Sequence, residues 1–381
     1  MFKKYKLRSY NFRLAILVIV ASIYGIVVIN SADSSFTLKQ CFGLVLGVVI
    51  MLVLSFIDYT WILKYYWIIY TINFLLLLAV PKFGKGSHGA KRWLDLKLFQ
   101  LQPSELSKIL MILVAAKILS MYKDKINDWK FLCILSVVLA IPLILVVIEP
   151  DLSTTILTFI VLFTVVFCAG LSYKIIGLVS VIVIPITIGA FIYISNPDNK
   201  VFFLEDYQRD RIMDFLYADE DDDGVYQQKM SETAIGSGRL KGKGLDNDDP
   251  ASLKNANYIP EAQTDFIFTI IGEELGFIGC MSAILLLFWI IIECIIVAIR
   301  TKDFAGRLIC CGVTAYIGFQ SFINIGVVTR ILPNTGLPLP FFSYGLTSLV
   351  TLFISIGIVL NINLQIKSEK DDDIFAKDFR G

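Results

Sequence analysis

One carboxylate lies where a polar segment meets a long apolar run, and it is the sharpest candidate for chemistry in the sequence. Glu261 and Asp265 are four residues apart, with Thr264 directly before Asp265 and three apolar residues directly after it. A carboxylate beside an apolar wall at a water boundary can have a raised pKa, which suits a general base. The alternative is an acidic residue at a helix start that stabilises the helix dipole.

A carboxylate and an ammonium lie three residues apart in the segment QPSELSK (102–108). Pro103 favours a helix start, so Glu105 and Lys108 should share one helical face. Burying either charge alone is costly, which favours a pair that lines a polar cavity. The alternative is that the side chains reach to water at a membrane interface.

The tripeptide EPD (149–151) joins two apolar runs with almost no loop. This brings Glu149 and Asp151 to the same surface. Asp151 suits an N-cap for the helix that follows, and an N-cap can also face a cavity.

Glycines and cations alternate in AIGSGRLKGKGL (234–245), which contains Arg239, Lys241 and Lys243. The segment lacks the P-loop pattern, so no nucleotide site is inferred. Backbone N–H groups freed by glycines could form an anion-binding nest for a phosphate or pyrophosphate, and a flexible charged loop is the alternative. The adjacent acids Glu273 and Glu274 lie inside an apolar run and must therefore be bonded.

Three prolines in RILPNTGLPLPFFSYG (330–345) predict a rigid hairpin between the last two apolar runs. Asn334, Thr335 and Ser343 are expected near its surface. His88 is the only histidine, and a lone histidine is poor support for a metal site.

The composition places these residues in a membrane. Of 381 residues 56% are hydrophobic and 18% are charged, and the mean hydropathy is +0.72, which excludes an ordinary soluble enzyme. The net charge of +1 gives no pull toward nucleic acid. Ten apolar runs predict ten transmembrane helices, at about 13–31, 38–57, 61–80, 103–121, 131–148, 152–170, 173–195, 266–299, 308–330 and 341–363.

An even number of spans and a basic N-terminal segment predict that both termini are cytoplasmic. A basic start followed by an apolar run could imitate a cleavable signal peptide, but nine further runs favour an uncleaved first helix. The predicted fold is all-α, a single transmembrane domain over 1–381. Its large extracytoplasmic loop, 196–264, lies between helices 7 and 8.

Two outer loops break the expected charge pattern. The loop 81–102 holds five Lys and Arg against one Asp, and the loop 196–264 holds eight against fifteen Asp and Glu. Lys and Arg are usually concentrated in cytoplasmic loops, so those in an outer loop are candidates for binding an anionic ligand. A long loop in so apolar a chain usually has a functional role.

These motifs together resemble the SEDS family, the RodA/FtsW/SpoVE membrane proteins of bacterial cell-wall synthesis. The matching stretches are GAKRW (89–93), QPSELSK (102–108), EPDLSTT (149–155), YQQKMSETAIGSGRLKGKGL (226–245), PEAQTDFIFTIIGEELGFIG (260–279) and LPNTGLPLPFFSYG (332–345). The run QRDR (208–211) before an acidic insertion looks more like the RodA elongation branch than the FtsW division branch.

The resemblance implies a peptidoglycan glycosyltransferase in the bacterial cytoplasmic membrane that polymerises lipid II on the outer face. It implies that Asp265 is the essential aspartate, that Glu105 and Lys108 form an ion pair, and that Asp151 is a site acid. Gln263 stands where the family often has His, and Arg239 stands where it commonly has Gly.

The resemblance also implies partners, namely a class B penicillin-binding protein and the elongation or division machinery. Cations should hold the departing pyrophosphate, and a divalent cation such as Mg²⁺ or Mn²⁺ held by acids such as Asp151 could contribute. A lipid II transporter and a scaffold without activity are the alternatives. The predicted substrate-binding residues are Lys91, Arg92, Trp93, Gln102, Ser104, Glu105, Lys108, Asp151, Ser237, Gly238, Arg239, Lys243, Glu261, Thr264, Asn324, Thr335 and Ser343.

Overall fold

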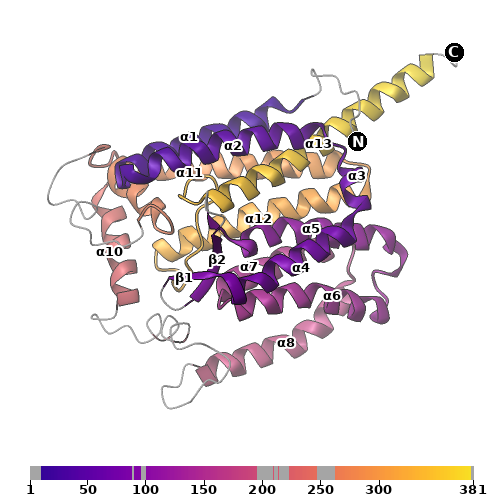
Figure 1. Cartoon of the computed structure of the whole chain (residues 1–381), viewed down its shortest axis with the longest axis horizontal. Coiled ribbons are helices and arrows are strands. Elements are labelled where there is room, and N and C mark those ends of the chain that lie inside the picture. The colour runs from indigo at the N-terminus through magenta and orange to yellow at the C-terminus, as the bar shows by residue number, and fades with distance from the viewer. Residues whose placement is uncertain are drawn as a thin grey trace.

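The computed structural model describes residues 10–87, 90–95, 100–194, 209, 213, 223–246 and 262–378. Long helices lie side by side in these segments, with short connections at the ends (Figure 1). The α-helices are α1 (Phe12–Ala32), α2 (Thr37–Phe56), α3 (Tyr59–Lys64), α4 (Tyr66–Phe83), α5 (Pro103–Met121), α6 (Trp129–Ile148), α7 (Leu152–Cys168), α8 (Tyr173–Ile194), α10 (Asp223–Ser237), α11 (Ile267–Arg300), α12 (Phe304–Val328) and α13 (Leu346–Asp378).

Every predicted apolar run contains a helix, and eight helices of the described residues are long and apolar enough to cross a membrane. The other two are α7, which is 17 residues long, and α5, whose charged residues lower its hydropathy. The chain is therefore a multi-pass membrane protein. The third predicted run is broken between α3 and α4, and the last helix begins at Leu346, because the prolines of 330–345 hold a non-helical hairpin before it.

Acidic side chains begin several of the helices. Asp58, Asp128 and Asp303 each accept a hydrogen bond from a backbone N–H in the first turn of α3, α6 and α12, at 2.9, 3.1 and 2.7 Å. These caps satisfy donors that the helix itself leaves without partners.

The centre of the bundle is α13, while α8 lies at its edge. In the apolar part of α13, 89% of residues are buried, compared with none in α8. Small residues allow α2 to approach α13 closely: a Cβ at Gly47 would lie 2.4 Å from the Phe353 ring, and one at Gly357 would lie 2.9 Å from Met51 O.

The predicted fold needs two corrections, both in segments predicted to be loops. Within 81–102 a small antiparallel sheet forms from β1 (Lys85–Ser87), β2 (Ala90–Asp95) and β3 (Gln100–Leu101), in the order β1-β2-β3. Lys85 pairs with Trp93, and Asp95 pairs with Gln100. Within 196–264, where only a loop was predicted, residues 223–237 form α10. Both elements satisfy backbone hydrogen bonds that an open loop would leave to water.

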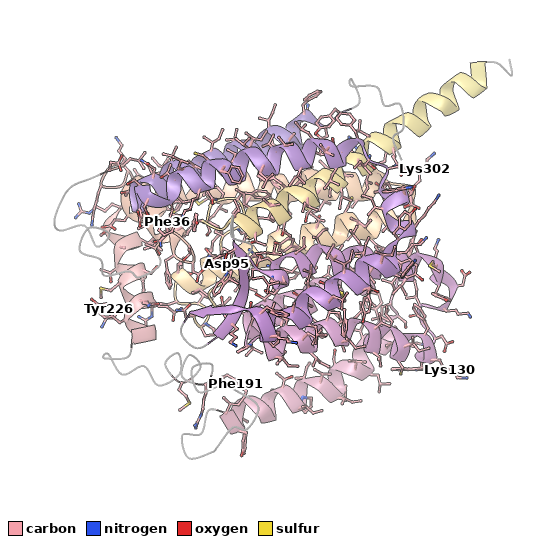
Figure 2. All side chains as sticks on the ribbon, in the orientation of Figure 1. Phe36, Asp95, Lys130, Phe191, Tyr226 and Lys302 are labelled. Carbon is pink, nitrogen blue, oxygen red and sulfur yellow. The ribbon has the colours of Figure 1, made fainter. Side chains whose placement is uncertain are left out.

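The two ends of the bundle differ. Lys130 and Lys302, from segments predicted to be cytoplasmic, lie at one end, and Phe36 and Tyr226 lie toward the other (Figure 2). The start of α1 and the end of α13 are at the lysine end, whereas α10 lies at the opposite end (Figure 1). The helix α10, which leads into residues 238–246, therefore lies away from the end at which the terminal helices start and finish.

Candidate active site

Asp265 lies in a turn, residues 262–266, that leads directly into α11; we call it the base turn. Asp265 is half-buried, and its backbone carbonyl accepts a hydrogen bond from Asn324 Nδ2 of α12 at 2.7 Å. Tyr344 N donates to Gln263 O at 2.9 Å. Because α11 has no side-chain N-cap, these contacts from other elements hold the base turn in place.

Glu105 and Lys108 form a buried pair within α5, which we call the α5 pair. Lys108 Nζ lies 2.7 Å from Glu105 Oε1, and the two side chains are 0% and 3% exposed. Lys108 Nζ also donates to Gln320 Oε1 at 2.9 Å and lies 4.8 Å from the centre of the Tyr316 ring. The predicted pairing is confirmed, and the alternative of a lysine that reaches to water is wrong.

This burial changes the role expected of Lys108. Its ammonium contacts a carboxylate, an amide oxygen and an aromatic face, and none of its side chain is exposed. Its three contacts are therefore all with protein groups, and its contact with a pyrophosphate stays a prediction. The sequence could not show this because Gln320 lies 212 positions away.

Asp151 links the start of α7 to the start of α5. Its Oδ1 accepts from Thr154 N at 3.2 Å, which confirms the predicted N-cap. Its Oδ2 accepts from Gln102 Nε2 and Ser104 Oγ, each at 3.4 Å. The Arg92 guanidinium of β2 donates to the carbonyl of Pro150. Arg92, Gln102 and Ser104 are thus brought to the EPD turn, as a common site requires.

Glu149 in the same turn is a buried acid without a salt bridge among the described residues. It is 1% exposed, and neither of its carboxyl oxygens has a hydrogen-bond partner in the described part of the chain. Burial, followed by the nearby Asp151 carboxylate, raises the pKa of Glu149 to about 9, and Arg92 only partly opposes this. Glu149 is therefore protonated at neutral pH.

Residues 238–246, the Gly-rich loop, do not form the predicted anion nest. Lys243 N and Gly244 N donate to the carbonyls of Glu273 and Glu274, both at 2.9 Å, and Gly242 N donates to Gly238 O at 2.8 Å. These N–H groups are therefore used inside the protein. The loop pairs with α11 because Gly276, at φ 65° and ψ −159°, interrupts that helix and frees its backbone groups.

The adjacent acids of α11 are bonded, as predicted. Lys243 Nζ lies 2.7 Å from Glu273 Oε1, and Ser31 Oγ of α1 donates to Glu274 Oε1 at 2.6 Å. Asp246 N donates in turn to Ser31 Oγ at 3.1 Å. Lys243 is thus committed to a carboxylate and holds the Gly-rich loop on α11.

The remaining candidates divide by accessibility. Lys91 and Arg239 are exposed, and Trp93 and Thr264 are partly buried. Ser343 was expected near the surface but is 6% exposed, and its hydroxyl accepts from Leu339 N at 2.7 Å, so it closes the hairpin from inside. Ser237 Oγ donates to Ala234 O, and Asn334 Nδ2 donates to Gln227 Oε1. Thr335 Oγ1 is buried with no partner among the described residues, and Glu261 lies outside them.

No three His, Cys, Asp or Glu side chains gather as a metal site in the described part of the chain. Both oxygens of Asp151 accept hydrogen bonds, as the carboxylates that bind metals in proteins commonly do, and the divalent cation considered above stays a prediction. A cavity of about 650 Å³ lies between α7, α11 and α12 and is lined almost entirely by apolar atoms. It contains no carboxylate, so it does not supply the acid–base chemistry.

Comparison with known proteins decides the family. The FtsW/RodA/SpoVE family, described as cell cycle protein, matches residues 8–368. The chain belongs to this family. The SEDS resemblance found in the sequence motifs is thereby confirmed.

Relatives of this FtsW/RodA/SpoVE protein match nearly end to end. Peptidoglycan glycosyltransferase MrdB of Escherichia coli K12 is 35% identical over 353 residues, which cover 91% of this chain and 92% of MrdB. A probable peptidoglycan glycosyltransferase FtsW of Geobacter sulfurreducens is 32% identical over 381 residues, which cover 95% and 97%.

Solved structures agree with this assignment. Rod shape determining protein RodA of Thermus thermophilus matches with a TM-score of 0.67 and 25% identity, covering 93% of this chain and 96% of RodA. A chain of a peptidoglycan synthase complex matches with a TM-score of 0.76 and 26% identity, covering 94% and 98%. These matches support the likeness to RodA.

Sequence reasoning missed the buried amides of this family member. Gln320 is 0% exposed and Gln40 is 1% exposed, and each binds the backbone of the hairpin 330–345. Gln228 of α10, 5% exposed, binds the start of the same hairpin. For Gln320 and Gln40 the available signal was a glutamine inside an apolar run, a polar group that must find a partner there.

Proposed function

We propose that this chain is a peptidoglycan glycosyltransferase that joins lipid II disaccharides into glycan strands and releases undecaprenyl pyrophosphate. The relatives described above are named as peptidoglycan glycosyltransferases or probable ones, and their sequences match almost the whole of this chain. The observation that carries the proposal is the half-buried Asp265, in a turn that the hairpin and α12 hold in place.

Asp265 acts as the general base. Its carboxylate removes the proton from the 4-hydroxyl of the acceptor's terminal GlcNAc. The resulting oxygen attacks the anomeric carbon of the donor's MurNAc in line. The bond to pyrophosphate breaks, the configuration changes from α to β, and the electron pair leaves with the pyrophosphate.

The negative charge on the departing pyrophosphate must be stabilised by cations, and burial and pairing reduce the number of Lys and Arg side chains that can do this. Lys108 and Lys243 are committed to carboxylates. Lys91 and Arg239 are exposed, and Arg92 lies at the EPD turn beside Asp151. Lys91, Arg92 and Arg239 are therefore the cations to which we assign the leaving group.

The topology we propose has ten spans, with both termini in the cytoplasm of a bacterium and the site on the outer face of its cytoplasmic membrane. The single domain covers 1–381, with an extracytoplasmic loop at 196–264. Support comes from a helix in each of the ten predicted runs and from the position of Lys130 and Lys302 at one end (Figure 2).

We assign the chain to cell elongation, together with a class B penicillin-binding protein that crosslinks the peptides. The RodA match and the neighbour from a peptidoglycan synthase complex support this assignment. A matching complex would be detected by co-purification of the full-length chain with the penicillin-binding protein from the same organism.

The test is polymerisation of labelled lipid II by the purified full-length protein. The wild type should yield a ladder of glycan products, and Asp265→Asn should lower the rate by about 10²–10⁴-fold, the usual contribution of a general base. Glu232→Gln is the control, because Glu232 is an exposed acid that pairs only with Arg330 in the described structure, at 3.2 Å.

The competing functions give different results. A transporter would move lipid II across liposome membranes without forming a ladder, and a scaffold would do neither and would tolerate Asp265→Asn. A folded Asp265→Asn variant that still polymerises lipid II at the wild-type rate would falsify the catalytic assignment.

A further inference from the structure

One face of α12 carries three buried polar side chains, each one helical turn from the next. Tyr316, Gln320 and Asn324 are spaced by four residues and are 0%, 0% and 1% exposed. Polar groups in this setting are costly unless bonded. Their bonds run between the α5 pair at one end of the row and the base turn at the other.

Gln320 connects the α5 pair to the hairpin. Its Oε1 accepts from Lys108 Nζ at 2.9 Å, and its Nε2 donates to Pro338 O at 2.8 Å. Tyr316, one turn away, donates its hydroxyl to Glu105 Oε2 at 3.4 Å. The amide of Gln320 is therefore fixed in orientation, since its oxygen faces a cation and its nitrogen faces a carbonyl.

Asn324 connects the hairpin to the base turn. Its Nδ2 donates to Leu337 O and to Asp265 O, both at 2.7 Å. Its Oδ1 is buried and has no partner among the described residues. A buried amide oxygen left in this way is unfavourable, so the favourable contacts of this side chain are its two donated bonds.

We propose that Gln320 and Asn324 are positioning residues that set the location of Asp265 by bonding adjacent hairpin carbonyls and the base turn. The α5 pair then acts on the reaction through Gln320, without touching substrate. This inference rests on the proposed function, because the location of Asp265 affects the rate only if Asp265 is the base.

The test compares three variants of the full-length protein in lipid II polymerisation. Gln320→Met should lower kcat by about 10²-fold with little change in KM, because misplacing a catalytic group by about 1 Å has an effect of that order. Asn324→Asp keeps the side-chain size but loses both N–H donors, and should lower kcat similarly.

The matched control is Gln228→Met. Gln228 is also buried and donates to Val327 O and Leu332 O at 2.8 and 2.9 Å, yet it has no bond to the α5 pair or the base turn. Gln228→Met should lower thermal stability as much as Gln320→Met does, because each substitution removes buried hydrogen bonds to backbone carbonyls. Its kcat should stay within about threefold of wild type, because Gln228 does not hold the base turn.

A double-mutant cycle distinguishes an effect of Lys108 that acts through Gln320 from a general loss of stability. If Lys108 acts through Gln320, the Lys108→Met/Gln320→Met double variant should be no slower than Lys108→Met alone, whereas adding Gln228→Met should multiply the separate effects. A kcat for Gln320→Met no lower than that of Gln228→Met overturns the inference, and so do multiplicative effects for the Lys108 pair of substitutions.

The inference and the proposed function fail in different ways. A wild-type protein that forms no glycan ladder overturns the function, and this inference with it. A wild-type ladder together with an unimpaired Gln320→Met variant overturns the inference alone. If Gln320→Met does not fold, Gln320→Glu keeps the acceptor for Lys108 while losing the donor to Pro338, and its kcat decides instead.

Discussion

Two Lys–Glu pairs in this protein have the same N–O distance of 2.7 Å and opposite surroundings. Glu105 and Lys108 belong to one helix and are almost completely buried. Glu273 and Lys243 belong to a helix and a loop, and the lysine side chain is 24% exposed. The same N–O distance therefore occurs in two pairs that have different structural roles.

The first pair is part of a side-chain network and the second is part of a backbone junction. The α5 pair bonds to Tyr316 and to Gln320 and, through Gln320, to the hairpin. The Lys243 pair accompanies main-chain bonds between the Gly-rich loop and α11. The role of a buried charge pair is therefore indicated by the other groups that its side chains contact, more than by the N–O distance within the pair.

The largest expected effect follows from the difference in burial. Lys108→Met leaves Glu105 without its cation at 3% exposure and should lower the free energy of unfolding by about 3–5 kcal/mol. Lys243→Met should lower it by about 1–2 kcal/mol. Glu273 is itself 0% exposed, but the Lys243 side chain is 24% exposed, so water can occupy the place of its ammonium and solvate the carboxylate.

Thermal and denaturant unfolding of both variants in one detergent would measure this difference. The Lys108→Met/Glu105→Gln double variant is the control, and it should recover most of the loss because no buried charge remains. Equal losses in the two single variants would show that burial does not distinguish the pairs.

The backbone junction makes the next prediction. At Gly276 a Cβ would lie 2.3 Å from Gly242 N, at a backbone conformation with φ 65° that is almost confined to glycine. Gly276→Ala should therefore lower the free energy of unfolding by about 2–3 kcal/mol.

Gly236→Ala is the control, and we expect it to raise the free energy of unfolding instead of lowering it. Gly236 lies inside α10, and no neighbouring atom lies within 4 Å of the place that an alanine Cβ would take, so alanine there should raise stability by about 0.5–1 kcal/mol. Paired thermal melts of the two variants test the junction, and a Gly276→Ala protein that melts with the wild type would contradict it.

Glu149, a buried acid that forms no salt bridge among the described residues, extends the comparison to the effect of pH. The pKa of Glu149 is raised from 4.5 to about 9, so between these values the folded chain holds a proton that the unfolded chain has released. Stability should fall as pH rises through this window, by up to about 1.4 kcal/mol per pH unit.

Glu149→Gln removes that ionisation while keeping the size of the side chain. The wild type should therefore lose more stability than Glu149→Gln when thermal melts at pH 6 and pH 8.5 are compared. The same loss in both proteins would mean that Glu149 is already ionised in the fold.

The sequence predicted what depends on neighbours along the chain. Apolar runs located the helices, Pro103 and Asp151 marked the starts of α5 and α7, and three-residue spacing identified the α5 pair. Each of these follows from helical periodicity or capping, which act within a few residues.

What the sequence could not show depends on residues far apart. Lys243 meets Glu273 across 30 positions, and Lys108 meets Gln320 across 212. The predicted phosphate nest was wrong because a glycine in α11, outside the Gly-rich loop, frees carbonyls that take the loop's N–H groups. The burial of Ser343 was likewise not predicted, because it results from a bond within its own hairpin, from Leu339 N to its hydroxyl.

The interruption at Gly276 also bears on membrane thickness. A straight helix of the 34 residues in α11 would be about 51 Å long, roughly 20 Å more than a hydrocarbon core. After Gly276 the helix has about 24 residues left, or about 36 Å, which matches a bilayer with a modest tilt. One glycine therefore sets the hydrophobic length of this span and leaves the segment that follows Asp265 free to pack within the protein rather than against lipid.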